Sequence, residues 1–217
     1  MAQYDWWQNS SWDEDTEATF FTKLARARNK LFYLREQGKT LASSRPDVAL
    51  RLLDQYFALG ADSSQAEAHF SRARAHVALR NVDAAILSFE AALAQEDAVP
   101  NFRTWVYLEL PVLIATEQRR ALYDRAIQLL TKHEDRPHFP AELYKWHGSW
   151  ALILQERGQT LEARNAAKQA LEAAAMTHSG YRYHPNVGLV SDTSDEFGSR
   201  LRKIAGELRA GPKWWRR

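Results

Sequence analysis

Two segments of the chain, residues 66–94 and 144–172, superpose when residue 66 is aligned with residue 144. Matching positions in the two copies carry the same small or apolar residues: Ala73 and Ala151, Ala85 and Ala163, Ala92 and Ala170, and Leu93 and Leu171. Antiparallel helices approach closely only where the facing side chains are small, so each copy is predicted to be a pair of packed helices. The offset leaves room for one more pair, of about 39 residues, between them.

That middle pair is expected at 103–117 and 119–132, where apolar residues recur at helical spacing. Its first helix contains Pro111, which lacks an amide donor and should kink the helix or end it early. Pro137, His138, Phe139 and Pro140 mark the loop before the last copy, and the region 64–175 is predicted to hold three helix pairs.

Upstream, residues 16–43 carry an apolar stripe at steps of three and four, which predicts one long helix. Ser11 with Glu14, or Asp13 with Thr16, could cap its start. Gly38 would be its weakest point. A second helix is expected from Pro46 to a stop at Gly60, which completes the segment 16–60.

The ends of the chain are rich in tryptophan. Trp6, Trp7 and Trp12 lie in the N-terminal segment 1–15, and Trp214 and Trp215 lie in the basic tail 210–217. Between the last repeat and this tail we expect an aperiodic loop at 176–192 and a capping helix at 193–209, started by Thr193 or Ser194. Stacked helix pairs expose apolar faces at both ends, so the aromatic segments are expected to fold back and cover them.

The first copy of the repeat resembles the tetratricopeptide repeat (TPR) family, in divergent, bacterial-type form. The residues that match its pattern of small and aromatic side chains are Ala73, Ala85, Ile86, Phe89 and Ala92. The resemblance implies an all-α fold: one domain over 1–217, built as a right-handed α-solenoid of antiparallel helix pairs. It implies about nine helices, with a C-terminal capping helix.

The resemblance also implies a function, because the first helices of successive TPR pairs line a concave groove that holds a peptide or partner protein. The groove positions carried over are Glu67, Phe70, Arg74, Val77, Lys145, Leu152, Gln155 and Glu156. Gly148 stands where a ligand-contacting side chain would be expected. The set of lysines and asparagines with which some family members clamp a terminal carboxylate is absent.

The loop 178–184 is a second candidate binding element. It gathers five aromatic or basic side chains: His178, Tyr181, Arg182, Tyr183 and His184. Such density, in a segment too long for a plain connector, is typical of a binding loop. The alternative interpretation is that the loop folds under the last repeat and its rings cover the core.

Composition excludes several functions. The formal net charge of +2 is too small for a whole-molecule field that would attract nucleic acid, and the absence of cysteine excludes thiol chemistry. No secretory signal or membrane span is recognisable, so we expect a cytoplasmic protein without stable membrane association. The oligomeric state stays open.

No catalytic motif is present, and we expect neither an enzyme nor a cofactor. His69 and His76 lie two helical turns apart, about 10.5 Å, which is too far for one metal ion, so no metal site is predicted.

The leading hypothesis is therefore a protein-interaction module, an adaptor or regulatory subunit. Two alternatives remain. One is a nucleic-acid binder that uses the basic first helix, with Lys23, Arg26, Arg28, Lys30 and Arg35 interleaved with Phe32 and Tyr33. The other is an enzyme centred on the 178–184 loop.

Overall fold

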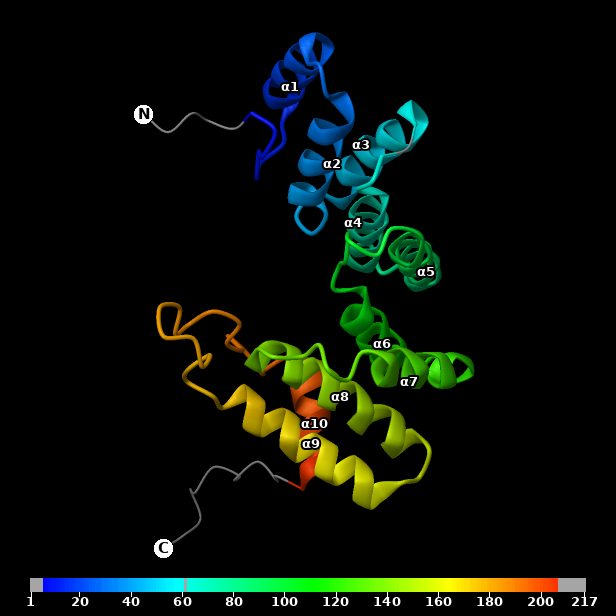
Figure 1. The fold of residues 1–217 in the computed structure, drawn as a ribbon, viewed down its shortest axis with the longest axis vertical. Coiled ribbons are helices and arrows are strands. Elements are labelled where there is room, and N and C mark those ends of the chain that lie inside the picture. Colours follow the sequence, from blue (N-terminus) through cyan, green and yellow to red (C-terminus); the bar gives the residue numbers. More distant parts are fainter. Residues whose placement is uncertain (1–5, 61, 207–217) are drawn as a thin grey trace, which may run out of the picture. The chain divides into compact units, whose positions relative to one another are not determined.

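The computed structural model describes residues 6–60 and 62–206, and the ordered secondary structure of these residues is helical, with no strand (Figure 1). The predicted all-α class is confirmed. Ten α-helices and one short 3₁₀ helix are present in the described ranges, against about nine expected. The chain divides into two compact units, Met1–Val106 and Tyr107–Arg217, which are described separately.

The first unit contains five helices: α1 Glu14–Arg26, α2 Lys30–Leu41, α3 Pro46–Leu59, α4 Gln65–Ala78 and α5 Val82–Ala98. The prediction of one long helix over 16–43 is wrong. The backbone becomes extended at Ala27, and α2 restarts at Asn29, whose side chain accepts the Phe32 amide at 3.1 Å. The apolar period continues across this break because Leu24 and Leu34 belong to the same buried core.

The ends of the first helices follow ordinary capping chemistry. Asp13 caps α1 by accepting the Thr16 amide at 2.8 Å, which is one of the two predicted caps. Gly60 ends α3 with a φ of 127°. Gly38 has a packing role in α2: an added Cβ would lie 2.9 Å from Cγ of Leu53 on α3, so the glycine permits close packing of the two helices.

The N-terminal tryptophans pack on the first two helices. The ring of Trp6 lies 4.6 Å from Tyr33 and 5.4 Å from Phe20, measured between centroids. Trp12 is buried. The backbone of this segment is fixed by Gln37 of α2, whose side-chain amide donates to the Asn9 carbonyl at 2.8 Å. The predicted covering of the core by the N-terminal aromatic segment is thus confirmed for residues 6–12, whereas Trp214 and Trp215 lie outside the described residues.

The second unit contains the remaining elements: α6 Val106–Thr116, which begins at the unit boundary, η1 Arg120–Leu122, α7 Tyr123–Lys132, α8 Pro140–Glu156, α9 Thr160–Ala174 and α10 Glu196–Ala205. Helix α6 continues past Pro111 to Thr116, so it does not end at the proline. The last helix begins at Glu196, and its cap is neither Thr193 nor Ser194 but Asp195, which accepts the Gly198 amide at 2.8 Å.

The three helix pairs share one turn. The residue two positions before each second helix, or before η1 in the middle pair, has a positive φ: 60° at Arg80, 52° at Gln118 and 77° at Gly158. The amide of the next residue then donates to the carbonyl five positions back. These bonds are Asn81 to His76, Arg119 to Ile114 and Gln159 to Leu154. The repeated geometry identifies the segment after α6 as the turn of a third repeat.

Candidate functional site

The first unit contains a pocket of about 350 Å³. Its lining comes from three segments: the end of α2, the start and middle of α4, and the connection between α5 and α6. Three of the predicted groove residues, Glu67, Phe70 and Arg74, line this one pocket. The remaining predicted residue of α4, Val77, is 39% exposed but is not part of the lining.

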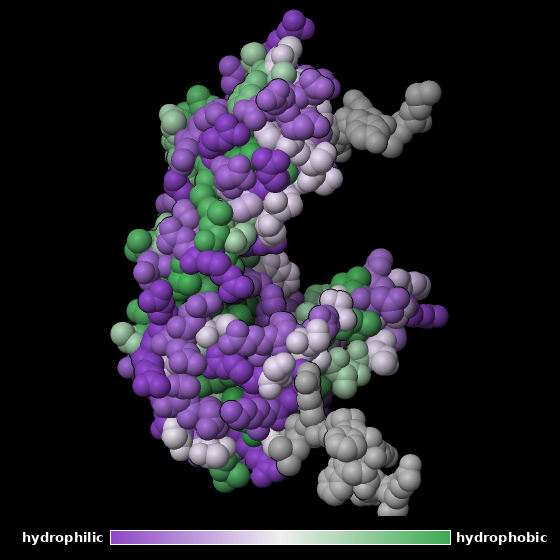
Figure 2. All heavy atoms as spheres, turned by 180° about the vertical axis from the view of Figure 1, so that it is seen from behind, coloured by the Kyte–Doolittle hydropathy of each residue, from purple (hydrophilic) through white to green (hydrophobic). Residues whose placement is uncertain are grey.

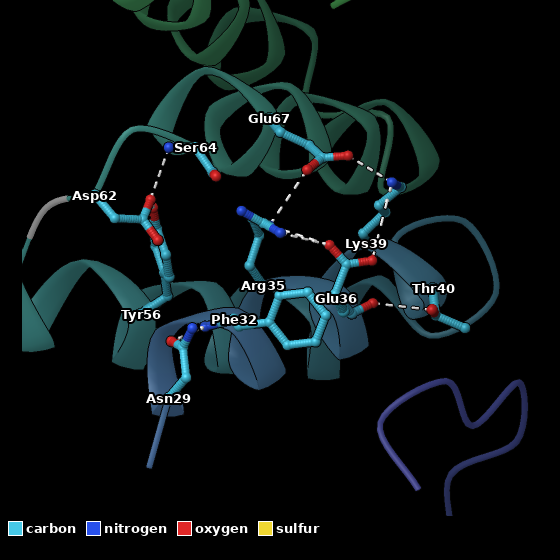
Figure 3. Close-up of polar contacts among 10 residues, drawn as sticks. All are labelled: Asn29, Phe32, Arg35, Glu36, Lys39, Thr40, Tyr56, Asp62, Ser64 and Glu67. Carbon is cyan, nitrogen blue, oxygen red and sulfur yellow. Dashed lines mark hydrogen bonds and ion pairs between the residues drawn. The ribbon is translucent and has the colours of Figure 1, made fainter. Parts of the chain in front are cut away.

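A quartet of charged side chains joins α2 and α4, and two of its members, Lys39 and Glu67, line the pocket (Figure 3). Arg35 of α2 lies 2.8 Å from Glu36 and 3.3 Å from Glu67 of α4. Lys39 lies 2.5 Å from Glu67 and 4.0 Å from Glu36. We call these four residues the α2–α4 quartet. The side chain of Arg35 is only 9% exposed, so these carboxylates compensate a buried charge.

The entry into α4 is fixed by Asp62, which appears beside the quartet in Figure 3. Its carboxylate accepts the Tyr56 hydroxyl at 2.5 Å and the Ser64 amide at 2.8 Å. Burial, followed by the neighbouring Asp62 carboxylate, raises the pKa of Tyr56 far above its usual value, so the phenol stays a neutral donor. These bonds position the first turn of α4, which carries Glu67.

The rim of the pocket is formed by residues 102–105, which the sequence analysis did not identify. Glu96 of α5 holds this segment in place, because its carboxylate accepts both the amide and the hydroxyl of Thr104 at 2.6 Å. Phe102 is 44% exposed and Trp105 is 49% exposed. Two large aromatic residues in a short connection were the available signal, but they match no repeat position.

Two arginines line the pocket, and each donates a hydrogen bond to a different neutral oxygen. Arg74 of α4 is exposed and donates to the Ser43 hydroxyl at 2.9 Å. Arg103 of the rim is exposed and donates from Nε to the Pro100 carbonyl at 3.2 Å. Both contacts orient a guanidinium while leaving most of its five donors available to another group.

The predicted groove residues of the second unit form a separate set. Lys145 pairs with Glu109 at 2.5 Å, Glu156 pairs with Arg120 at 2.7 Å, and Gln155 is exposed. Leu152 is 1% exposed, so the expectation that it contacts a partner is corrected: it belongs to the core.

Helix α10 covers part of the predicted groove surface of α8. A Cβ added to Gly148 would lie 2.4 Å from Cζ of Phe197 and 3.1 Å from Leu201, both on α10. Gly148 stands where a ligand-contacting side chain was expected, and α10 of the same unit covers this part of the α8 surface.

The 178–184 loop is ordered by its own hydrogen bonds. The buried Ser179 hydroxyl donates to the His184 carbonyl at 2.7 Å and accepts the Tyr181 amide at 3.2 Å. The ring of Tyr181 stacks on Phe139, with centroids 5.2 Å apart. All five predicted loop residues, His178, Tyr181, Arg182, Tyr183 and His184, are nevertheless exposed.

The basic first helix is altered by the break at Ala27 and by packing. Arg35 is engaged in the α2–α4 quartet, while Phe32 and Tyr33 are partly buried, with Tyr33 against Trp6. This leaves the exposed cations Lys23, Arg26, Arg28 and Lys30 for a nucleic-acid hypothesis.

Searches of the described residues for other kinds of site give two findings. They contain no group of three or more His, Asp or Glu side chains placed to hold a metal ion. Within the same ranges, no helix combines the length and the apolar character needed to cross a bilayer.

On the face drawn in Figure 2, hydrophobic residues lie in small groups among hydrophilic ones, so hydropathy alone does not single out a docking surface there.

Comparisons with known proteins place the fold. No protein-family model matches the sequence. No curated protein matches it either. Among solved structures, the chain is similar to the crystal structure of MamA, with a TM-score of 0.56 and 23% sequence identity over 73% of this chain and 86% of that one. At this level of identity the likeness concerns the fold, which is that of a TPR-like, all-α protein of helix pairs.

Proposed function

We propose that this chain is a protein-interaction module, an adaptor or regulatory subunit, that binds a peptide or protein segment in the pocket of the first unit. The observation that carries the proposal is the composition of that pocket. Glu67, Phe70 and Arg74 of α4 line it together with the exposed rings of Phe102 and Trp105. Exposed aromatic and arginine side chains around a concavity are typical of the energetic centre of protein interfaces.

The proposal is for binding without catalysis. The single carboxylate in the lining, Glu67, is shared by Arg35 and Lys39. Among the described residues, the lining offers neither a second carboxylate nor a histidine as a partner for acid–base chemistry. The remaining lining residues supply charge, hydroxyl groups and aromatic surface.

The test is affinity purification of the tagged protein from its native cell extract, with the cytoplasm as the proposed compartment. Arg74→Glu and Lys145→Glu are compared separately, because they reverse one charge in the first and in the second unit. Circular dichroism melts confirm that both variants fold. The proposal predicts a partner that is retained by Lys145→Glu and lost with Arg74→Glu.

Retention of the same partners by Arg74→Glu would contradict binding in this pocket. If Lys145→Glu alone loses the partner, the binding surface lies on the second unit instead.

A further inference from the structure

The α2–α4 quartet, which contributes Lys39 and Glu67 to the pocket lining, is balanced in charge. It contains two cations, Arg35 and Lys39, and two carboxylates, Glu36 and Glu67. Each carboxylate contacts both cations, and the charges of the quartet therefore compensate one another. Because Glu67 is the carboxylate that lines the pocket, no acidic group of the lining is left to neutralise further cations.

Two further cations line the same pocket. Arg74 and Arg103 donate to neutral oxygens, the Ser43 hydroxyl and the Pro100 carbonyl. Among the residues that the structure describes, neither guanidinium has a carboxylate partner. A guanidinium binds a carboxylate through two parallel hydrogen bonds, and such charge-assisted bonds are about twice as strong as neutral ones. The pocket thus presents an uncompensated charge of two at positions held by α4 and by the rim.

The apolar part of the pocket is aromatic. The ring of Phe70 packs against the buried ring of Phe89, with centroids 5.6 Å apart. Phe102 and Trp105 expose about half of their surface beside it. A volume of about 350 Å³ lies at the small end of ligand pockets and suits one or two large side chains.

We infer that this pocket selects an acidic peptide segment that carries a large apolar side chain. Resting on the proposed function, the inference adds the chemistry of the partner. Carboxylates of the segment pair with Arg74 and Arg103, while its apolar side chain lies against Phe70, Phe102 and Trp105. The two arginines come from different segments of the chain, and this separation favours an extended ligand with more than one carboxylate.

The test uses fluorescein-labelled peptides of about nine residues, roughly 30 Å when extended. Each peptide holds one central Trp, Phe or Leu flanked by Asp and Glu, by the matching amides Asn and Gln, or by Lys. A fourth peptide is acidic and has Ser at the centre. Binding to the full chain is measured by fluorescence polarisation at low and at high salt.

The acidic peptides with an apolar centre are expected to bind at least about tenfold more tightly than the amide set, and to weaken with added salt. The acidic Ser peptide should also lose about tenfold, because it lacks the side chain that covers the rings. The double variant Arg74→Gln/Arg103→Gln should remove the preference for acidic over amide peptides.

A matched control is Arg26→Gln/Arg28→Gln, which changes the net charge equally at two exposed positions, the last residue of α1 and the break before α2. It should keep the preference. If the control loses the preference and the pocket variant keeps it, acidic peptides bind the cations around the α1–α2 break and the inference is overturned. Equal binding of acidic and amide peptides, or no binding by the acidic set, also overturns it.

These outcomes are separable from failure of the proposed function. Amide peptides that bind as tightly as acidic ones, and are lost on Phe70→Ala/Phe102→Ala, would leave a peptide-binding pocket without acidic selectivity. Peptide binding that is insensitive to every pocket variant would remove both.

Discussion

Oε2 of Glu67 on α4 lies 3.3 Å from Nε of Arg35 on α2. This ion pair fixes the spacing of the two helices that line the pocket, and it does so around a guanidinium whose side chain is 9% exposed. Loss of this ion pair is therefore expected to change both the free energy of unfolding and the shape of the pocket.

Replacing Glu67 by glutamine is therefore expected to lower the free energy of unfolding by about 1–3 kcal/mol, because the buried Arg35 charge loses one of two carboxylates. The control is Asp124→Asn, which breaks the 2.6 Å pair with Arg157 at a side chain that is 84% exposed. That change should cost less than about 1 kcal/mol. Urea denaturation measures both, and equal losses would show that the Arg35 pair behaves as a surface pair.

The Trp12 indole contributes a pH-dependent term through Glu17. Its Nε1 donates to the Glu17 carboxylate at 2.8 Å, and this bond is the main cause that holds the pKa of Glu17 below its usual value. A depressed carboxylate pKa stabilises the fold above the unfolded-state pKa, and this stabilisation is lost as the pH falls through the folded-state pKa. Trp12→Phe should thus lower Tm at neutral pH. The difference in Tm between this variant and the wild type should become smaller as the pH falls and Glu17 is protonated.

Thermal melts from neutral to acidic pH test this term. When Glu17 is replaced by glutamine, the Tm difference caused by Trp12→Phe should no longer depend on pH, because the titrating group is gone. If this Tm difference shrinks equally with and without Glu17, another group causes the pH dependence.

The shared turn of the helix pairs predicts a stabilising substitution. Arg80 holds a φ of 60°, which costs a residue with a side chain about 1 kcal/mol and costs glycine little. Arg80→Gly should therefore raise the free energy of unfolding by about 0.5–1 kcal/mol. The reverse change at the matching position, Gly158→Ala, should lower it by about 1 kcal/mol through backbone conformation alone, since no atom lies within 4 Å of the added Cβ. Chemical denaturation checks the signs, and destabilisation by Arg80→Gly would contradict the account of the turn.

Contact between α8 and α10 depends on Gly148. Gly148→Ala places a methyl group 2.4 Å from Cζ of Phe197, which is too close for contact, so α10 should loosen while α9 keeps its packing. Hydrogen–deuterium exchange should rise in 196–205 by about tenfold or more and change little in 160–174. Phe197→Leu in the same chain should restore part of the protection. Unchanged exchange in α10 would mean that the helix adjusts without cost.

The sequence predicts those features of the structure that depend on residues close together in the chain, and it misses those that depend on distant contacts. The helix pairs at 66–94 and 144–172 follow from small residues such as Ala73 and Ala151, because side-chain size alone sets how closely two helices approach. The break before α2 was not predicted, since the core on both sides continues the same apolar period. Asn29 becomes recognisable as a cap only once the helix is known to stop there.

The candidate site shows the same division. Positions on α4 could be assigned from the repeat, because the turn and register of a helix pair fix which residues share a face. Phe102 and Trp105 could not be assigned, since their place depends on the bonds between Glu96 and Thr104 in an irregular segment. Leu152 was misplaced because a repeat pattern carries no information about where a surface becomes buried.

The central claim, that a partner segment occupies the pocket of the first unit, is tested most directly by photo-crosslinking in the native cell. The photoreactive residue p-benzoylphenylalanine replaces Phe102 at the rim or, as control, Leu87, a 73% exposed residue of α5 outside the pocket. The account predicts one partner crosslinked from position 102 and not from position 87. Equal crosslinking from both positions, or crosslinking from position 87 alone, would contradict it.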